Sequence, residues 1–376
     1  TSLQISAIGS DGSMLSTAAL AALNTRNIVG LSSTAIAALS SDQVQALGAD
    51  ASVLGTSALG ALTSVNIRGL ATAALALMSS DQVAALGVDG AHIGTANLAA
   101  LTSDNIRGLT VGTLAALSSD SVAALGNNAL LLSSSQLAAL TSANVRGLET
   151  SAVVAMSTLQ VNSLGDDARG LSTAAIDALT TVNIAGLTSG AVAAMSSDQV
   201  AAIGADAAEV GTAFLAALTS VNVSGLTTAA LAAMSSAQVA AMGVAAKGLV
   251  TGDLAALNSK NVMGLASSAV AAMTSSQVAA LGSVAADLST SALAALTGTN
   301  IIGLTTAALN AMGSDSVAAL GADLAKLDTN ALGALTTDNL SGLTTDAAVA
   351  LTSQQLSALA QNATGLSTSA LAALTT

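Results

Sequence analysis

A fixed internal repeat constrains this chain more than any other feature. The segment that begins at Leu15 and reads Leu-Ser-Thr-Ala-Ala-Leu-Ala-Ala-Leu returns in variant form at every 39th residue. Nine full repeats occupy 15–365, with partial repeats at 1–14 and 366–376, and no insertion or deletion interrupts the period. Chains with such a period usually stack their repeats as a solenoid, in which each unit packs on its neighbours. We therefore expect one continuous repeat array over 1–376.

The spacing of apolar residues within a repeat separates helix from strand. Apolar positions follow one another alternately by five and by three, so that four octads and one heptad make up each repeat. In a strand these odd steps would place successive apolar residues on opposite faces, whereas alanine favours helix. One continuous helix is also excluded, because a period of eight turns the apolar stripe by about 80° per octad. The pattern predicts an all-α solenoid of very short helices separated by turns.

Helix-start signals recur in the same register. Ser40 and Gln43 have the spacing of a capping box, and Ser79 with Gln82 repeats it one unit later. Helices of about six residues are unstable alone, because nucleation costs more than one or two turns return. We therefore expect the short helices to be held by stacking on the repeats before and after them.

Two glycine positions are expected to end helices as left-handed C-terminal caps. The second position starts at Gly9 and Gly48 and holds in nine of ten cases, with Ala360 as the exception. The first position is glycine in all nine repeats: Gly30, Gly69, Gly108, Gly147, Gly186, Gly225, Gly264, Gly303 and Gly342.

An unbroken ladder of asparagines accompanies the first glycine position. Each asparagine follows a Thr or Asn by three residues, which is the spacing for capping a helix start and for satisfying turns between repeats. The alternative is a row of ligand-binding amides. The ladder is Asn27, Asn66, Asn105, Asn144, Asn183, Asn222, Asn261, Asn300 and Asn339.

A row of aspartates occupies one position of the heptad. Asx turns account for this row, and Ala245 and Val284 fill the same position in two repeats. A calcium row is the alternative, although one carboxylate per repeat supplies few of the six to eight ligands that calcium takes. We expect no cofactor, with calcium as the open alternative. The row is Asp11, Asp50, Asp89, Asp167, Asp206 and Asp323, with Asn128 and Asn362 at the equivalent positions.

Two further charged rows stand out. Arg68, Arg107 and Arg146 share one position in three consecutive repeats and form a basic stripe that could dock an acidic neighbour. The equal alternative is three solvated cations. The second row lies beside helix starts, where negative charge is favourable to the helix dipole. It consists of Asp42, Asp81, Asp120, Asp198 and Asp315.

The remaining notable side chains suggest no chemistry. Six methionines replace leucine at one apolar position and are expected to fill the core. His92 and Phe214 each occur in a single repeat and belong to no constellation. With one His, no Cys, no Tyr and eight Lys plus Arg, the chain lacks most groups from which general bases and activated nucleophiles are made. We expect no enzyme and no catalytic residue.

Charge and hydropathy limit the partners. The 21 acidic and 8 basic residues give a net charge of −13, which repels the phosphates of nucleic acid. Polar residues interrupt every apolar stretch before the roughly 18 residues of a membrane span. The segment after Thr1 has neither the basic start nor the apolar run of a signal peptide, so we expect a processed chain or one that uses no signal.

Both ends of the sequence keep the repeat pattern. Solenoids that act as monomers usually carry polar terminal repeats that cover their ends. Neither the segment that starts at Thr1 nor the segment 366–376 is such a terminal repeat. We expect either a piece of a longer repetitive protein or end-to-end stacking of copies, which forms a filament if the contact does not close.

The octads at Leu39–Leu47 (Leu-Ser-Ser-Asp-Gln-Val-Gln-Ala-Leu) and Met78–Leu86 (Met-Ser-Ser-Asp-Gln-Val-Ala-Ala-Leu) resemble Leu-Thr-Thr-x-Gln-Val-x-Ala-Leu arrays in very large bacterial surface or secreted proteins. The resemblance covers the whole chain and implies an extracellular structural or adhesive role without catalytic residues. We hypothesise a self-assembling component of an extracellular filament, sheath or surface layer, built by lateral and end-to-end packing of copies of the solenoid. The alternatives are a stalk within a large adhesin and, from the Thr and Ser pairs, an ice-binding solenoid.

Overall fold

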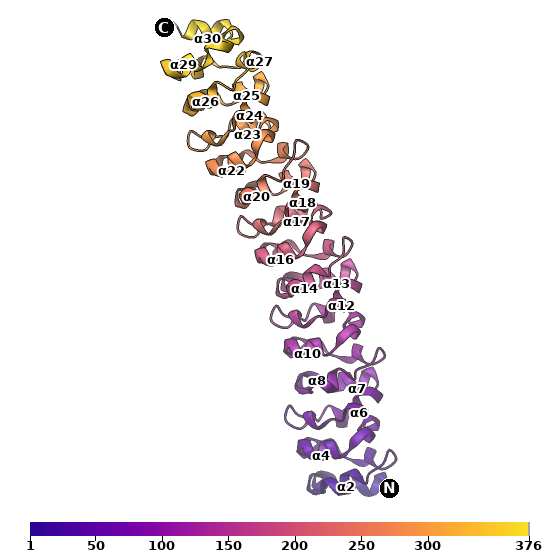
Figure 1. Ribbon diagram of the computed structural model, residues 1–376. Helices are drawn as coiled ribbons and strands as arrows, with labels where there is room; N and C mark the ends of the chain where they lie inside the picture. The colour runs from indigo at the N-terminus through magenta and orange to yellow at the C-terminus, as the bar shows by residue number, and fades with distance from the viewer. Residues whose placement is uncertain (375–376) are drawn as a thin grey trace. The chain divides into compact units, whose positions relative to one another are not determined.

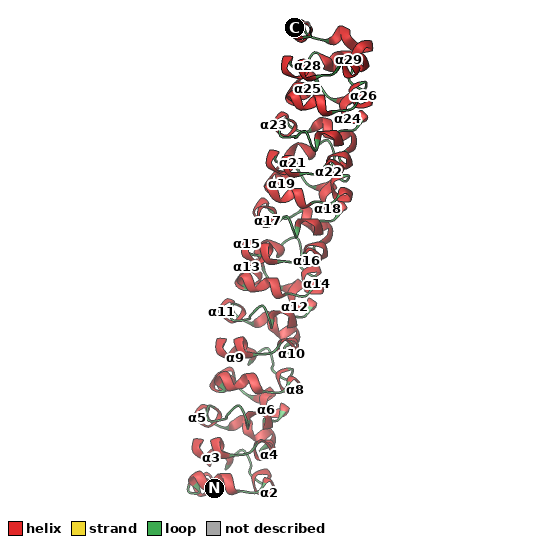
Figure 2. Cartoon of the chain, turned by 90° about the vertical axis from the view of Figure 1, so that its left-hand side faces the viewer, coloured by secondary structure: helices red, strands yellow, loops and turns green. Residues whose placement is uncertain are grey.

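The computed structural model describes residues 1–374, and all regular secondary structure in this part of the chain is helical (Figure 2). Each repeat, called a coil below, holds five short helical segments that correspond to the four octads and the heptad. The predicted all-α repeat solenoid is confirmed. The coil at 54–92 contains α5 (Thr56–Leu59), η4 (Ile67–Gly69), α6 (Thr72–Leu77), α7 (Ser80–Ala85) and η5 (Gly87–His92), where η denotes a 3₁₀ helix.

By its internal contacts the chain divides into two compact units, Thr1–Ala191 and Val192–Thr376. The helix α15 (Ser189–Ala194) spans the junction, and the repeat register continues through it without insertion or deletion.

Unit 1 is built from short α-helices and ten 3₁₀ helices. The α-helices are α1 (Ser2–Ser6), α2 (Thr17–Ala21), α3 (Ser33–Ala38), α4 (Ser41–Ala46), α5 to α7 as above, α8 (Thr95–Leu98), α9 (Val111–Ala116), α10 (Ser119–Ala123), α11 (Ser134–Leu137), α12 (Thr150–Ala155), α13 (Thr158–Ser163) and α14 (Thr173–Asp177). The 3₁₀ helices are η1 (Gly9–Met14), η2 (Ile28–Gly30), η3 (Gly48–Val53), η4, η5, η6 (Ile106–Gly108), η7 (Gly126–Leu131), η8 (Val145–Gly147), η9 (Gly165–Gly170) and η10 (Ile184–Gly186).

Unit 2 follows the same order of segments. Its α-helices are α16 (Ser197–Ala202), α17 (Thr212–Ala217), α18 (Thr228–Ala233), α19 (Ser236–Ala241), α20 (Thr251–Leu254), α21 (Ser267–Ala272), α22 (Ser275–Ala280), α23 (Thr290–Leu293), α24 (Thr306–Ala311), α25 (Ser314–Ala319), α26 (Thr329–Leu332), α27 (Thr337–Leu340), α28 (Thr345–Ala350), α29 (Ser353–Leu359) and α30 (Thr368–Ala373). The 3₁₀ helices are η11 (Gly204–Ala208), η12 (Val223–Gly225), η13 (Gly243–Gly248), η14 (Val262–Gly264), η15 (Gly282–Asp287), η16 (Ile301–Gly303), η17 (Gly321–Lys326) and η18 (Ala360–Gly365).

Coils stack in chain order within each unit, as the succession of α2, α4, α6 and α8 in Figure 1 illustrates for unit 1. The helix α4 packs on η4 of the next coil, and α7 packs on η6 in the same way. The interior between coils is filled by two large apolar side chains per octad; Leu59, Ile67 and Leu75 are fully buried. Each such side chain contributes about 1.5–3 kcal/mol on burial, which stabilises helices too short to persist alone.

The second glycine position adopts the expected left-handed conformation. Its nine glycines, from Gly9 to Gly321, have φ between +53° and +63°, and a 3₁₀ helix follows each turn. Where Ala360 replaces the tenth, φ stays at −56° and the preceding α29 has seven residues instead of the usual six. A left-handed turn is strained for any residue with a Cβ, so this exception follows from the substitution.

At the first glycine position the expected left-handed cap is wrong. Gly30 and its eight counterparts have no positive φ. The reason for glycine is close packing instead: a Cβ on Gly69 would overlap the backbone oxygen of Ser41 in the preceding coil, and one on Gly108 would overlap that of Ser80. Glycine here lets a 3₁₀ helix lie directly against the first turn of the α-helix in the coil before it.

Candidate interaction surface

The asparagine ladder ties each coil to the one before it. The Oδ1 atom of Asn66 accepts a hydrogen bond from the backbone N–H of Thr63 (2.8 Å), and its Nδ2 donates to the backbone oxygens of Ile36 (2.9 Å) and Leu39 (3.0 Å). From Asn66 to Asn339 these side chains are at most 2% exposed. In the half-buried Asn27, Oδ1 accepts from the N–H of Asn24 (2.7 Å). From Asn66 to Asn339 the ladder thus serves the backbone and offers no amide face to solvent.

A second amide ladder lies at the capping boxes, which are confirmed. In Gln43, Oε1 accepts from the N–H of Ser40 (2.7 Å), while Nε2 donates to the backbone oxygens of Ser13 (2.7 Å) and Leu15 (2.8 Å), which flank the boundary with the preceding repeat. Sequence reasoning missed the second half of this arrangement. The sequence contained a signal for it. A capping box alone can be completed by Glu as well as by Gln, so the choice of Gln indicates a further role for the amide group.

Where the heptad row makes side-chain hydrogen bonds, they join it to segments 25–27 residues earlier and are not the expected Asx turns. Asp167 accepts a hydrogen bond from the backbone N–H of Ser142 (2.8 Å), and at the equivalent position Asn128 donates to the backbone oxygen of Leu101 (2.8 Å). Within either unit the aspartates lie one per coil. Across residues 1–374 no group of three or more His, Cys, Asp or Glu side chains is placed to hold a metal ion.

One buried carboxylate departs from this pattern. Asp253 is 6% exposed and occupies the repeat position of Asn97 and Gln136, whose amide groups donate to the backbone oxygens of Leu70 (2.6 Å) and Leu109 (2.6 Å). Burial raises the pKa of Asp253, and the hydrogen bond from the N–H of Val250 opposes that rise only in part. An ionised carboxylate cannot donate where the amides do.

The arginine stripe and the neighbouring aspartate row are both exposed in unit 1. Arg68, Arg107 and Arg146 stand in the middle of η4, η6 and η8, and Nε of Arg107 donates to the backbone oxygen of Leu131 (3.2 Å). Asp42, Asp81 and Asp120 lie in the first turns of α4, α7 and α10, which pack on those three 3₁₀ helices.

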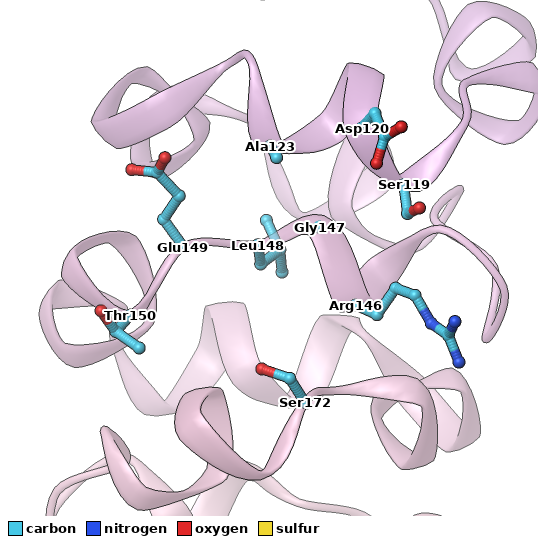
Figure 3. Close-up of a pocket in the computed structure, with 9 residues that line it drawn as sticks. All are labelled: Ser119, Asp120, Ala123, Arg146, Gly147, Leu148, Glu149, Thr150 and Ser172. Carbon is cyan, nitrogen blue, oxygen red and sulfur yellow. The ribbon is translucent and has the colours of Figure 1, made fainter.

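Some of these charged side chains line an open groove of about 530 Å³ (Figure 3). Asp120 lines it from α10, Arg146 from η8 and Glu149 from the turn that follows η8. In Figure 3 the Arg146 side chain extends away from Asp120. Two carboxylates and a guanidinium therefore share one solvent-facing surface.

A row of hydroxyl groups is exposed at the first residue of one α-helix per coil. The residue before it is usually the N-cap, as Ser172 is for α14, where its hydroxyl accepts from the N–H of Ala175 (3.1 Å). Where the preceding residue is serine, only the second hydroxyl of the pair is therefore free of the cap. The row is Thr17, Thr56, Thr95, Ser134, Thr173, Thr212, Thr251, Thr290, Thr329 and Thr368.

The other residues singled out in the sequence are ordinary parts of the fold. The methionines at Met78, Met156, Met195, Met234, Met273 and Met312 are 3–4% exposed, which confirms them as core residues. Phe214 is 8% exposed within α17, and His92 is exposed at the end of η5.

Comparison with known proteins recovers the repeat. Segments 13–49 and 248–283 match the family model of the ALTTAQ repeat. No curated protein and no solved structure matches the chain. The chain therefore carries repeats of the ALTTAQ type at these two places, in the register of the coil. Among residues 1–374, none of the helices combines the length and apolar character required to cross a bilayer.

Proposed function

We propose that this chain is a structural, self-assembling repeat protein of an extracellular filament, sheath or surface layer. The observation that carries the proposal is the periodicity of the exposed surface. Hydroxyl side chains recur at one exposed position in every coil, so a contact made by one coil can be made again by the next. Contacts that repeat in this way add through multivalency, even when each is weak.

The composition of the surface supports the same proposal. Only 8% of residues are charged, and several large apolar side chains are exposed, among them Leu3, Leu159 and Val221 at 81%, 67% and 77%. A surface with few charged residues and several exposed apolar side chains supports association of copies through apolar contacts, which the net charge of −13 opposes.

Electron microscopy and sedimentation of the purified chain over a range of protein and salt concentrations test the proposal. We expect ordered, concentration-dependent assemblies. Dispersed monomers under all conditions would contradict it and would instead be expected of a stalk that holds an adhesin away from the cell.

The exposed threonine row favours ice binding as a second candidate. A regular hydroxyl row can match a lattice only if it is solvent-facing, as this one is. Measurement of thermal hysteresis tests this candidate, and ice growth unaltered by the protein would remove it.

A further inference from the structure

Unit 1 carries two columns of exposed residues. In both columns the side chains change from apolar to charged and back to apolar at the same levels. Each level of the columns pairs one residue with the residue 26 positions later, in the following coil. The first column is Leu3, Asp42, Asp81, Asp120 and Leu159. The second column is Val29, Arg68, Arg107, Arg146 and Ala185. All ten residues are exposed.

The two columns lie side by side. At the five levels α1 packs on η2, α4 on η4, α7 on η6, α10 on η8 and α13 on η10. At the fourth level Asp120 and Arg146 line the same open groove (Figure 3). The columns therefore form one surface, called the paired columns below, with an apolar level at each end and three levels of opposite charge between them.

We propose that the paired columns bind the paired columns of a second copy of this chain, side by side and parallel. This inference rests on the proposed self-assembly and names the surface that makes one of its contacts. The symmetry of the contact follows from the residues. A two-fold axis parallel to the stacking direction of unit 1 places the first column of one copy on the second column of the other, level by level.

In that arrangement every level is complementary. Asp42 faces Arg68 of the second copy and Arg68 faces its Asp42, and the next two levels repeat this exchange. At the ends, Leu3, which is 81% exposed, faces Val29 of the second copy, and Leu159 faces Ala185. An antiparallel two-fold axis would instead set aspartate against aspartate and arginine against arginine, which is unfavourable.

The second column alone would suit any acidic partner, but such a partner leaves the first column unexplained. An acidic protein that binds three arginines gains nothing from three aspartates beside them and is repelled by them. A second copy uses both columns at once. Because each chain carries a net charge of −13, two copies approach favourably only where opposite charges meet.

The contact is weak at each level and depends on repetition. Exposed ion pairs contribute little individually and are screened by salt, but the two-fold axis makes six Asp–Arg pairs in one interface. We therefore expect dimerisation of the full chain to weaken by about tenfold or more when salt rises from roughly 50 mM to 500 mM.

Charge reversal of each column tests the inference. The variants are Arg68→Glu/Arg107→Glu/Arg146→Glu and Asp42→Arg/Asp81→Arg/Asp120→Arg in the full chain, measured alone and mixed by sedimentation velocity. We expect each variant alone to lose dimerisation by about tenfold or more, and the mixture to recover it as a heterodimer. The control Lys247→Glu/Lys260→Glu/Lys326→Glu makes the same change in net charge as the arginine variant, on exposed residues of unit 2, and is expected to dimerise like the parent chain.

The outcomes separate the two proposals. If the parent chain assembles and both reversed variants assemble equally well, the paired columns are not the contact, while self-assembly stands. A mixture that fails to recover association also overturns the inference. A parent chain that stays monomeric at all concentrations overturns the proposed function and the inference together. Circular dichroism of each variant verifies that it folds.

Discussion

Units 1 and 2 share an interior and differ on one exposed surface. The asparagine ladder runs through both units. In unit 1 the side-chain amide of Asn144 donates hydrogen bonds to the backbone oxygens of Leu114 and Leu117. In unit 2 Asn261 donates in the same way to those of Leu231 and Met234. At the positions of the paired columns, however, unit 2 replaces arginine by Ser224, Met263, Ile302 and Ser341, and the facing aspartates by Ala237 and Ser276 in two of its four levels.

This difference separates what the fold requires from what it permits. A buried position repeats because each residue contacts its equivalents in the coils before and after it, so a change there disturbs three coils. Met263 and Ile302 are 53% and 56% exposed and are free of that restraint. Residue types therefore differ among coils mainly at exposed positions. These differences give one stretch of the surface a different chemical character from another.

The largest effect is expected from the ladder, and it should be equal in both units. Asn144→Ala and Asn261→Ala each remove two hydrogen bonds to backbone oxygens and one from a backbone N–H in the interior, which costs about 3–5 kcal/mol. Because the chain has no Trp or Tyr, guanidinium unfolding is followed by circular dichroism. A cost below about 1 kcal/mol in either unit would show that its ladder does not hold the coils together.

Substitution of glycine by alanine should destabilise the chain for a different reason at each of the two glycine positions. Gly108→Ala forces a Cβ against the backbone oxygen of Ser80 and should cost about 2–4 kcal/mol, because the coils must separate. Gly87→Ala meets no atom within 4 Å but keeps φ at +55°, and should cost about 1–2 kcal/mol. Gly264→Ala in unit 2 is the match for Gly108→Ala. Equal costs for Gly87→Ala and Gly108→Ala would contradict the distinction.

A smaller effect is expected at Asp253, a carboxylate in unit 2 at the position where two coils of unit 1 have the amides of Asn97 and Gln136. Because burial raises the folded-state pKa of Asp253, the folded state holds its proton more tightly than the unfolded state, so this residue lowers stability as pH rises above about 4. Asp253→Asn can donate as Asn97 does and should stabilise the chain by about 1–2 kcal/mol at pH 7. The gain should disappear below about pH 4.

The control for Asp253 is the exposed Asp346→Asn, which should leave stability unchanged at both pH values. A gain at Asp253→Asn that persists undiminished in acid would mean that ionisation is not its cause.

The smallest effect on stability is expected where the units differ most. Exchanging the exposed residues by Arg107→Met and Met263→Arg should change the free energy of unfolding by less than about 0.5 kcal/mol each. Thermal unfolding by circular dichroism measures this. A loss of more than about 2 kcal/mol from either substitution, a size typical of buried positions, would show that these residues support the fold.

Much of the interior was predictable from the sequence, because its causes are local or periodic. The octad spacing, the Ser–Gln capping boxes and the left-handed turns at Gly48 and its equivalents all follow from residues within one coil. Contacts between coils were harder to predict. The overlap that excludes a Cβ at Gly69 and the hydrogen bond from Gln43 to the backbone oxygen of Ser13 depend on how one coil packs on another, which no spacing within a coil reveals.

The surface was predictable only in part. The arginine stripe and the aspartate row were visible separately, but their pairing across successive coils emerged only once α4 was seen to pack on η4. The stripe therefore changes from a site for any acidic neighbour into half of a self-complementary surface.

Cysteine cross-linking tests the parallel contact most directly, because the chain has no cysteine of its own. Full-length Asp81→Cys chains are oxidised alone and in a mixture with Arg107→Cys chains of different mass. The parallel arrangement predicts rapid formation of the mixed disulfide dimer and little dimer of Asp81→Cys alone. A disulfide dimer that forms readily from Asp81→Cys alone, and not from the mixture, would contradict it.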